Sequence, residues 1–485
     1  MSISNALANA LTGLNAVSRA ADVVSSNVAN ALTEGYGRRE IELTSTQTGR
    51  SGSGVAVVGV SRYHDPVTTG ERRLADAERA LEDTRAGFFA AFATAMGRAD
   101  EAHSVGGRIT GLETALIEAA SRPDSPARLA SVLDAAEDLT ARLNSASDDL
   151  MDLRISADRQ IGQTVDLLQS TLDQVVELNV AIRKQISNGY DANTLMDQRQ
   201  VLIDRIAEIV PVTEIPRENG MVALYTTGGA ALVESKAATV SFTATPTITP
   251  DMTLANGALS GLSINGMPVS TDAGKGAIAG GKLAGLFELR DELAPQAQKQ
   301  LDALARDLIE RFATTDADPT LAPGAAGLFT DGGLAFDALS EEGLAGRISV
   351  NALVKPAAGG DLWRLRDGLG AAAEGEQGDA TILSSLSGVL RATRVASSGD
   401  LVGIGRTALG FASDIYSLVE TSRLHAEAEL THAAARQQTL HAIELENGVD
   451  TDHEMQQLLV IEQSYAANAK VIETIQALMD QLMRI

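Results

Sequence analysis

The sequence has no cysteine, and this absence excludes several kinds of chemistry at once. The chain cannot form disulfides, thiolate metal sites or a cysteine nucleophile. Aromatic residues make up only 3% of the chain, so its cores have to be built from Ala, Leu, Val and Ile. Side chains of this kind suit closely packed helices.

Basic residues and long hydrophobic runs are also scarce. The chain carries 39 basic and 64 acidic residues, a net charge of −25, and such a surface repels phosphate backbones and anionic lipids. We therefore expect neither nucleic acid nor a membrane among its partners. No run of 18 apolar residues occurs, and the first basic residue is Arg19, so neither a membrane span nor a cleavable signal peptide is predicted.

What the chain does contain is a heptad repeat at each end, in which residues follow one another in alternating steps of three and four. The C-terminal seam consists of Leu458, Ile461, Tyr465, Asn468, Ile472, Ile475, Met479 and Leu482. The N-terminal seam consists of Ile3, Leu7, Ala10, Leu14, Val17, Ala21, Val24 and Val28. Matching periods predict that the two helices pair as a coiled-coil stem, in which the polar Asn468 fixes the register.

Between the ends, helical periodicity gives way to strand periodicity and then returns. Residues 38–62 read as a β-hairpin beside the stem, and helices are expected at 71–96, 109–120, 126–187 and 195–209. We expect Ser125 to cap the third of these helices and Pro126 to occupy its first turn. After Pro211, short runs rich in Val and Thr alternate with Asn-Gly and Gly-Gly pairs, which is typical of hairpins. Helices are expected again at 283–312 and from about residue 381.

The predicted fold is mainly α with a smaller β-domain, in a nested arrangement. Its terminal stem comprises residues 1–37 and 449–485 and is expected to be disordered in the free monomer. An elongated helical bundle, with a short β connector at 38–62, comprises residues 38–210 and 283–448. An outer β-rich domain comprises residues 211–282, with parts of 314–380 as an alternative addition.

Two stretches near the chain ends resemble known signatures. Residues 26–36, which include Asn30, Gly35 and Tyr36, are similar to the N-terminal signature of the bacterial flagellar axial proteins, although Glu34 stands where that pattern has proline. Residues 462–472 are similar to the C-terminal signature, with Glu462 in place of a bulky apolar residue. The resemblance implies that these positions and the two seams form an assembly interface.

The middle of the chain narrows the resemblance to one branch of that family. Residues 124–128, 177–182 and 193–199 resemble the Pro-x-x-Arg, Leu-Asn-x-x-Ile and Asn-x-Leu-x-Asp-x-Arg motifs of the first hook-associated protein family, FlgK. Where that family often has a second Asp after the Arg, this chain has Gln200.

The resemblance implies a structural subunit at the junction between flagellar hook and filament, with no enzymatic activity and no cofactor. Export by the flagellar type III apparatus and an extracellular location follow from the same resemblance. The implied partners are further copies of the chain in a ring, the hook protein, a second junction protein of the hook-associated protein 3 type, and a cytoplasmic export chaperone for the C-terminal region. Two alternatives stay open: another axial subunit of hook or rod type, and an intracellular coiled-coil scaffold.

Several motifs resemble catalytic or metal sites without meeting their requirements. Residues 276–282 have the spacing of a phosphate-binding loop, but Leu283 follows where a Mg²⁺ ligand is needed. His453 and Glu454 begin like a zinc-protease motif, but Gln457 replaces the second histidine. The helical His425, His432 and His441 lack a carboxylate or thiolate at ligand spacing.

A charged cluster lies on the predicted helix 195–209. Asp197, Arg199, Asp204 and Arg205 form either a subunit interface or intramolecular ion pairs, and we favour ion pairs.

Overall fold

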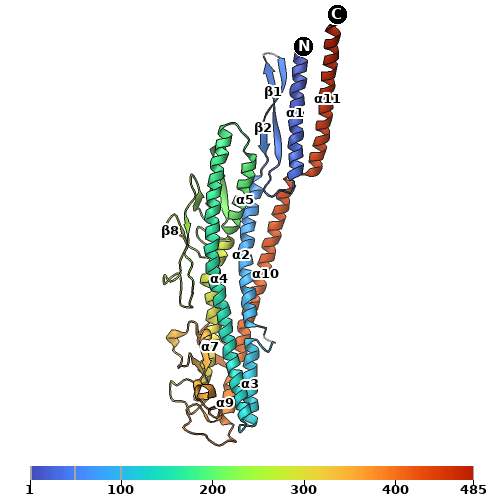
Figure 1. Ribbon diagram of the computed structural model, residues 1–485. Helices are drawn as coiled ribbons and strands as arrows, with labels where there is room; N and C mark the ends of the chain where they lie inside the picture. The colour runs from blue at the N-terminus through green and yellow to red at the C-terminus, as the bar shows by residue number, and fades with distance from the viewer. Residues whose placement is uncertain (1–2, 49–50, 99–100, 273, 484–485) are drawn as a thin grey trace.

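Long helices set the shape of the molecule, which is elongated with both chain ends at one extremity (Figure 1). The structure is a computed structural model, and it describes residues 3–48, 51–98, 101–272 and 274–483. Its central element is α4 (Pro126–Ser187), whose 62 residues span about 93 Å at the usual helical rise. Helices α2 (Pro66–Met96) and α10 (Ala408–Glu446) pack against each other beside it, and α5 (Asn193–Ile209) turns back along it. These four helices are called the shaft below.

The ends of α4 follow from local sequence, with one difference from expectation. Pro126 occupies the first turn and Ser125 the N-cap position, both as predicted, but the Ser125 side chain makes no capping hydrogen bond. The backbone carbonyl of Ser125 accepts from Leu129 N instead, at 3.2 Å. At the other end Gly189 has a φ of +75°, and Tyr190 N donates to Gln185 O at 3.0 Å, which closes the helix in the way that Asn-Gly predicts.

The helix expected at 283–312 is interrupted by a wider turn. It consists of α6 (Gly281–Glu288), a π-helical turn at Leu289–Leu293, and α7 (Ala294–Phe312). Pro295 follows the π turn directly. Because proline lacks an N–H and its ring crowds the carbonyl four residues earlier, a locally widened helix accommodates it.

Short elements close the end of the shaft that lies away from the chain termini. They are α3 (Val105–Ser121), α8 (Arg364–Asp367), α9 (Thr381–Arg391), β9 (Phe329–Asp331), β10 (Ile348–Val350), β11 (Arg394–Val395) and β12 (Gly405–Arg406). Five 3-10 turns also occur among the described residues, at Glu218–Gly220, Ala338–Ser340, Leu344–Gly346, Ala352–Val354 and Pro356–Ala358. The strand expected at 347–351 is β10, which pairs antiparallel with β9.

The β-rich stretch after Pro211 forms two separate three-stranded antiparallel sheets in the described residues. The first contains β3 (Val212–Pro216), β4 (Val222–Thr226) and β5 (Ala231–Val233). The second contains β6 (Val240–Ser241), β7 (Ser263–Ile264) and β8 (Met267–Pro268). Both sheets lie along α4 (Figure 1). The predicted turn residues Asn219-Gly220 and Asn265-Gly266 all have positive φ. Asn265-Gly266 forms a two-residue hairpin turn, whereas Asn219-Gly220 lies in a three-residue loop closed by Arg217 N donating to Met221 O.

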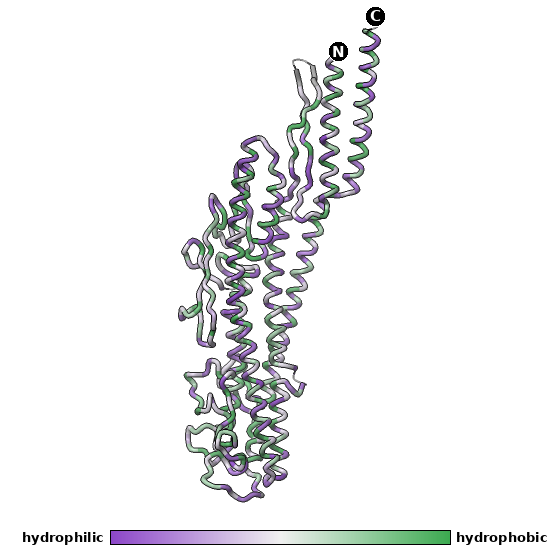
Figure 2. The backbone as a smooth tube through the Cα atoms, viewed as in Figure 1, coloured by the Kyte–Doolittle hydropathy of each residue, from purple (hydrophilic) through white to green (hydrophobic). Residues whose placement is uncertain are grey.

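The stem consists of α1 (Ile3–Asn30), α11 (Thr451–Met483) and the hairpin of β1 (Arg39–Thr48) and β2 (Ser51–Arg62). Residues 31–38 link α1 to β1, residues 63–65 link β2 to α2 of the shaft, and residues 447–450 link α10 of the shaft to α11; these three linkers are together called the elbow. Figure 2 shows polar and apolar residues alternating along α1, α11 and the shaft helices. One continuous apolar core runs through the shaft and its far end, and within the described part of the chain it includes no residue of α1 or α11. The mainly helical fold class with a smaller β part is confirmed.

Candidate assembly interface at the terminal stem

The stem is built around α1, which contacts α11 on one side and the hairpin on the other (Figure 1). The two helices approach each other closely at Gly13, where an added Cβ atom would stand 3.0 Å from the Asn468 side-chain oxygen. Asn468 itself donates its Nδ2 to Ser464 O at 3.0 Å. The polar seam position predicted from the heptad therefore sits opposite a glycine, and the missing side chain lets the helices come together.

The two seams are buried to different degrees along their length, and exposed positions occur both in the middle and at the ends. On α11, Ile475 is buried, Leu458, Ile461, Asn468 and Ile472 are half-buried, and Tyr465, Met479 and Leu482 are exposed. On α1, Ala10 and Val24 are buried, Ile3, Leu7, Leu14, Val17 and Ala21 are half-buried, and Val28 is 37% exposed. A helix with 3.6 residues per turn drifts by about 20° per heptad, so a straight helix does not keep every heptad position facing its partner.

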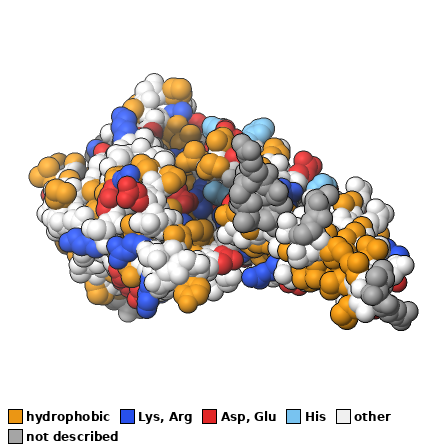
Figure 3. Space-filling view, turned by 90° about the horizontal axis from the view of Figure 1, so that it is seen from above, with side chains coloured by type: hydrophobic (Ala, Val, Ile, Leu, Met, Phe, Trp, Pro, Cys, Tyr) orange, Lys and Arg blue, Asp and Glu red, His pale blue; other side chains and the backbone are white. Residues whose placement is uncertain are grey.

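Much of the apolar surface of the stem has no cover in the single chain. Within the described part of α11, only Glu454 and Ile475 are buried. The exposed apolar side chains of the stem include Leu11, Val28, Met455, Leu459, Val460, Val471, Leu478 and Met483. Figure 3 views the molecule from this end and shows hydrophobic side chains at its surface. Monomeric proteins rarely expose apolar patches of this kind without a binding role.

At the elbow, the N-terminal signature forms a buried polar cluster around Asn27, which is 1% exposed. Its Nδ2 donates to Arg39 O at 2.9 Å and to Glu454 Oε1 at 3.1 Å. Its Oδ1 accepts from Tyr36 Oη and from Arg39 N, both at 2.9 Å. One amide side chain thereby joins α1, the elbow, the first residue of β1 and α11.

The other signature residues shape the connection that follows α1. Asn30 donates its Nδ2 to Ser26 O at 2.9 Å and accepts from the Thr33 hydroxyl at 3.3 Å. Gly35 has a φ of +75°, and an added Cβ would lie 2.5 Å from Val201 Cγ2 on α5. Glycine is therefore required at this point, because a side chain would collide with the shaft.

Asp197 on α5 fastens the base of the hairpin to the shaft. It accepts from Gly37 N at 3.1 Å and forms ion pairs with Arg39 at 2.5 Å and Arg62 at 2.7 Å. The Arg39 guanidinium also lies over the Tyr36 ring, 4.8 Å from its centroid. Since Asp197, Arg39 and Arg62 are all largely buried, this pairing is protected from water.

A second buried ion-pair network joins α2, α5 and α10 just below the elbow. Arg72 pairs with Asp76, Asp204 and Glu444, and Arg73 pairs with Asp204 and Glu214. Burial alone would lower the pKa of Arg72, but Asp204, Glu444 and Asp76 together raise it above its ordinary value. Both guanidinium groups therefore remain charged within the network.

Of the four charged residues predicted on α5, three form ion pairs or hydrogen bonds with other parts of the chain. Asp197 and Asp204 take part in the networks above, and Arg199 donates to Asn179 Oδ1 at 2.9 Å and to Gly220 O at 2.6 Å. Burial lowers the pKa of Arg199 to about 10. The predicted intramolecular ion pairs are confirmed for Asp197 and Asp204. Arg199 bonds within the chain to neutral oxygens instead, and Arg205 is exposed.

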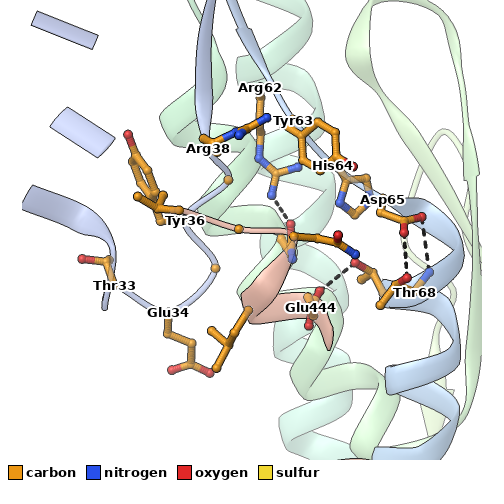
Figure 4. Close-up of a pocket in the computed structure, with 18 of the residues that line it drawn as sticks. Thr33, Glu34, Tyr36, Arg38, Arg62, Tyr63, His64, Asp65, Thr68 and Glu444 are labelled. Carbon is orange, nitrogen blue, oxygen red and sulfur yellow. Dashed lines mark hydrogen bonds between the residues drawn. The ribbon is translucent and has the colours of Figure 1, made fainter. Parts of the chain in front are cut away.

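A cavity of about 430 Å³ lies at the elbow, between the end of α1, the start of α2 and the end of α10 (Figure 4). Its wall is polar and internally paired: Asp65 accepts from the Thr68 hydroxyl at 2.6 Å, and Glu444 accepts from Thr69 at 2.7 Å. Burial lowers the pKa of His64, with Arg62 acting in the same direction. Several of the polar side chains that line the cavity therefore hydrogen-bond to one another.

Comparison with known proteins shows a similarity to flagellar proteins. A model described as the flagellar hook-associated protein FlgK helical domain matches residues 95–328. Models described as the flagella basal body rod protein and the C-terminal part of the flagellar basal body rod FlgEFG protein match residues 7–36 and 446–485. The middle of the chain is thus similar to FlgK, and its two ends are similar to flagellar rod proteins.

Named relatives show the same similarity. Flagellar hook-associated protein 1 of Salmonella typhimurium is 26% identical over 321 residues, which is 64% of this chain and 56% of the relative. The protein of the same name from Escherichia coli is 24% identical over 64% of this chain and 57% of the relative. The one from Bacillus subtilis is 24% identical over 47% of each chain. The chain thus matches about half the length of these relatives.

A similarity to one solved structure was also found. The flagellar hook junction protein FlgK from Burkholderia pseudomallei is 20% identical, with a TM-score of 0.45, and the match covers 54% of this chain and 47% of that one.

The sequence motifs that resemble phosphate-binding or metal sites do not form such sites in the described residues. In the loop-like stretch 276–282, an added Cβ on Gly281 would lie 2.4 Å from Ile209 O, so its glycine serves the close approach of α6 to the end of α5. His425, His432, His441 and His453 are all exposed. The described residues contain no group of three or more His, Asp or Glu side chains arranged to hold a metal. No described helix is long and apolar enough to cross a membrane.

Sequence reasoning missed the residues that organise the elbow. Asn27, Arg39 and Glu454 are buried polar groups, and a search for apolar seam positions passes over them. Asn27 could have been found from its place in the N-terminal signature, one residue before the seam position Val28. Nothing local to Glu454 indicates its burial, because its partner lies 427 residues away.

Proposed function

We propose that this chain is a structural subunit of the bacterial flagellum at the junction between hook and filament, and that it assembles through α1 and α11. The observation that carries the proposal is the stem, a pair of helices with its own seam and with uncovered apolar side chains along its outer surface. Covering such side chains against neighbouring copies would stabilise each contact by up to about 1.5–3 kcal/mol per large residue.

The proposal gives each segment of the chain a separate role in the assembled structure. Residues 1–37 and 449–485, the two terminal segments of the stem, fold fully on assembly and line the inner tube. Residues 38–210 and 283–448 form the helical body, and residues 211–282 face outward. The family match supports this role for the helical body, since the FlgK helical-domain model lies on residues 95–328.

The proposed partners are further copies in a ring, the hook protein on one side and a second junction protein of the hook-associated protein 3 type on the other. A cytoplasmic chaperone would cover the C-terminal region before export through the flagellar type III apparatus. The proposed place of action is the extracellular flagellum.

Deletion of residues 449–485 in the source bacterium tests the proposal. The expected result is loss of filament attachment and of motility, while the shaft stays folded. Immunogold labelling adds location: labelling restricted to the hook–filament junction is expected, and labelling along the whole hook would favour a hook subunit instead. A motile deletion strain, or a protein that stays in the cytoplasm, would overturn the proposal.

Point substitutions make the same test without removing a helix. Leu459→Asp combined with Leu478→Asp places charge on two exposed apolar positions of α11, and we expect it to prevent filament attachment. Gln463→Asp combined with Gln476→Asp adds the same charge at exposed polar positions of the same helix and should leave motility intact.

A further inference from the structure

The polar cluster at the elbow contains one carboxylate whose position is unusual. Glu454 is 2% exposed, and its Oε1 accepts from Asn27 Nδ2 at 3.1 Å. Its Oε2 is buried and has no hydrogen-bond partner among the described residues. Burying a carboxylate with one unpaired oxygen costs free energy, so α11 gains little from this position unless Asn27 is aimed at it.

Asn27 can be aimed at Glu454 only when the rest of the cluster is formed. Its Oδ1 is held by Tyr36 Oη and Arg39 N, and the second hydrogen of its Nδ2 is used by Arg39 O. With Glu454 in place, both hydrogens and both lone pairs of this amide are engaged. The orientation of the amide is therefore set by the first residue of β1 and by the elbow.

α11 reaches the hairpin through α1 and this cluster. The helix packs on α1, and α1 packs on β1 and β2. At the base of the hairpin, the backbone of Arg39 makes two hydrogen bonds with the same Asn27 side chain that bonds Glu454. When α11 is docked, Asn27 is 1% exposed, and hydrogen bonds sealed from water are stronger than the same bonds in contact with it.

We propose that Asn27 and Glu454 form a polar latch that couples docking of the C-terminal helix to ordering of the β1–β2 hairpin. Docking of α11 seals the bonds between Asn27 and Arg39, and a formed hairpin base in turn orients Asn27 to receive Glu454. Such coupling is reciprocal, so each event favours the other by the same factor. The latch concerns contacts within one chain and does not depend on the proposed place in the flagellum.

A chain without cysteine allows this coupling to be tested with a single engineered cross-link. The Cβ position of Gly13 lies 3.3 Å from Asn468 Cγ, so Gly13→Cys with Asn468→Cys places two thiols within reach of a disulfide that closes the stem. Hydrogen exchange of the backbone amides in residues 39–43 and 57–62 is then measured by mass spectrometry in the oxidised and the reduced full-length chain.

The expected result is that oxidation slows exchange at the hairpin base at least tenfold. Adding Glu454→Ala to the oxidised chain should remove most of this protection although the stem stays closed, and Glu454→Gln should give an intermediate value because its amide oxygen can still accept from Asn27. Glu462→Ala, at an exposed position two turns further along α11, is the matched control and should leave protection unchanged.

Three outcomes would overturn the latch. The first is a hairpin that exchanges at the same rate in the oxidised and reduced chains. The second is a hairpin whose protection is the same in the Glu454→Ala and Glu462→Ala chains. The third is failure of the two cysteines to form a disulfide under oxidation, because the stem would then not have the geometry on which the latch depends.

Discussion

Gly281 illustrates how one residue can suggest chemistry in a sequence and serve conformation in the structure. It stands in a stretch with the spacing of a phosphate-binding loop, yet it has a φ of +77° and packs against the backbone of Ile209. Both features demand glycine, the first because other residues disfavour the left-handed region and the second because no side chain fits.

Gly281→Ala is therefore expected to destabilise the chain more than an alanine at a comparable but open glycine. Gly189 has a φ of +75° with no atom within 4 Å of an added Cβ, so Gly189→Ala should cost only about 1–2 kcal/mol for the left-handed backbone. Gly281→Ala adds a collision with rigid backbone and should cost a further 1–3 kcal/mol or so. Urea unfolding of both variants measures the difference, and equal midpoints would contradict this explanation.

Asp302 on α7 is a buried carboxylate whose burial no sequence pattern indicated. It accepts from Gly343 N and Ala345 N, each at 2.8 Å, and burial raises its pKa to about 6 in spite of these hydrogen bonds. The folded chain thus holds this proton to higher pH than the unfolded chain, whose ordinary value is 3.8. The linked stability is fully present below about pH 3.8 and is lost as the pH rises through about 6.

We expect the Asp302 contribution to the unfolding free energy to fall by an amount on the order of 2–3 kcal/mol between pH 4 and pH 7. Asp302→Asn removes the titration, so its stability curve should be flatter than that of the parent chain across this range. Asp316→Asn, at an exposed position shortly after α7, is the control and should keep the parent slope. Parallel curves for the parent chain and Asp302→Asn would show that this carboxylate does not titrate as its burial requires.

At the scale of elements, the π turn before Pro295 positions an arginine that fixes the loop after β6. Arg290 is fully buried, pairs with Asp158 on α4 at 2.7 Å, and its guanidinium lies over the rings of Phe242 and Phe287. Asp158 in turn accepts from Thr245 N at 2.6 Å. The widened turn, the shaft and the loop after β6 are thereby joined at one charged pair.

Replacing Arg290 should be costly because it leaves the carboxylate of Asp158 buried without its charged partner. We expect Arg290→Met to destabilise the chain by about 3–5 kcal/mol in chemical unfolding. Arg423→Met removes a partly exposed arginine from pairs with Glu420 and Glu427 along α10, and it should cost less than about 1 kcal/mol. Adding Asp158→Asn to Arg290→Met should recover part of the loss, and failure to do so would mean that packing of the arginine dominates.

The extents of the elements show what sequence can and cannot predict. The apolar periodicity of α2 and α4 and the turn pairs Asn219-Gly220 and Asn265-Gly266 act over a few residues, and they were predicted correctly. Strand β6 is shorter than the run of residues 239–243 suggested, because its pairing extends over only two residues of β7. The heptads predicted that α1 and α11 pair. Which seam positions are buried depends on how the two helices cross, which no local pattern contains. Glu454 was missed for the same reason, since its burial depends on a residue at the other end of the chain.

At the scale of the molecule, the stem and the shaft differ in how they are held. The continuous apolar core lies in the shaft, whereas α11 buries only two of its described side chains. Because helices with little burial are marginal in water, the stem should open readily in the free chain.

Limited proteolysis of the purified monomer tests this difference. We expect rapid trimming of both ends to a resistant core of roughly residues 60–445, identified by mass spectrometry. Resistance of both ends at protease levels that cleave exposed loops would mean that the stem is already closed in the monomer, and the intracellular scaffold would then gain support.

The nested path of the chain also sets an order in time. Helix α2 ends at Met96, but the helix that packs along it, α10, begins at Ala408, and α1 has to wait for α11 beyond residue 450. A chain delivered from its N-terminus, whether by a ribosome or through a channel, cannot complete the shaft until most of its length has emerged. Contacts so distant in sequence close slowly. The shaft can therefore be completed only when most of the chain has emerged, and the stem can close only after α11 has emerged.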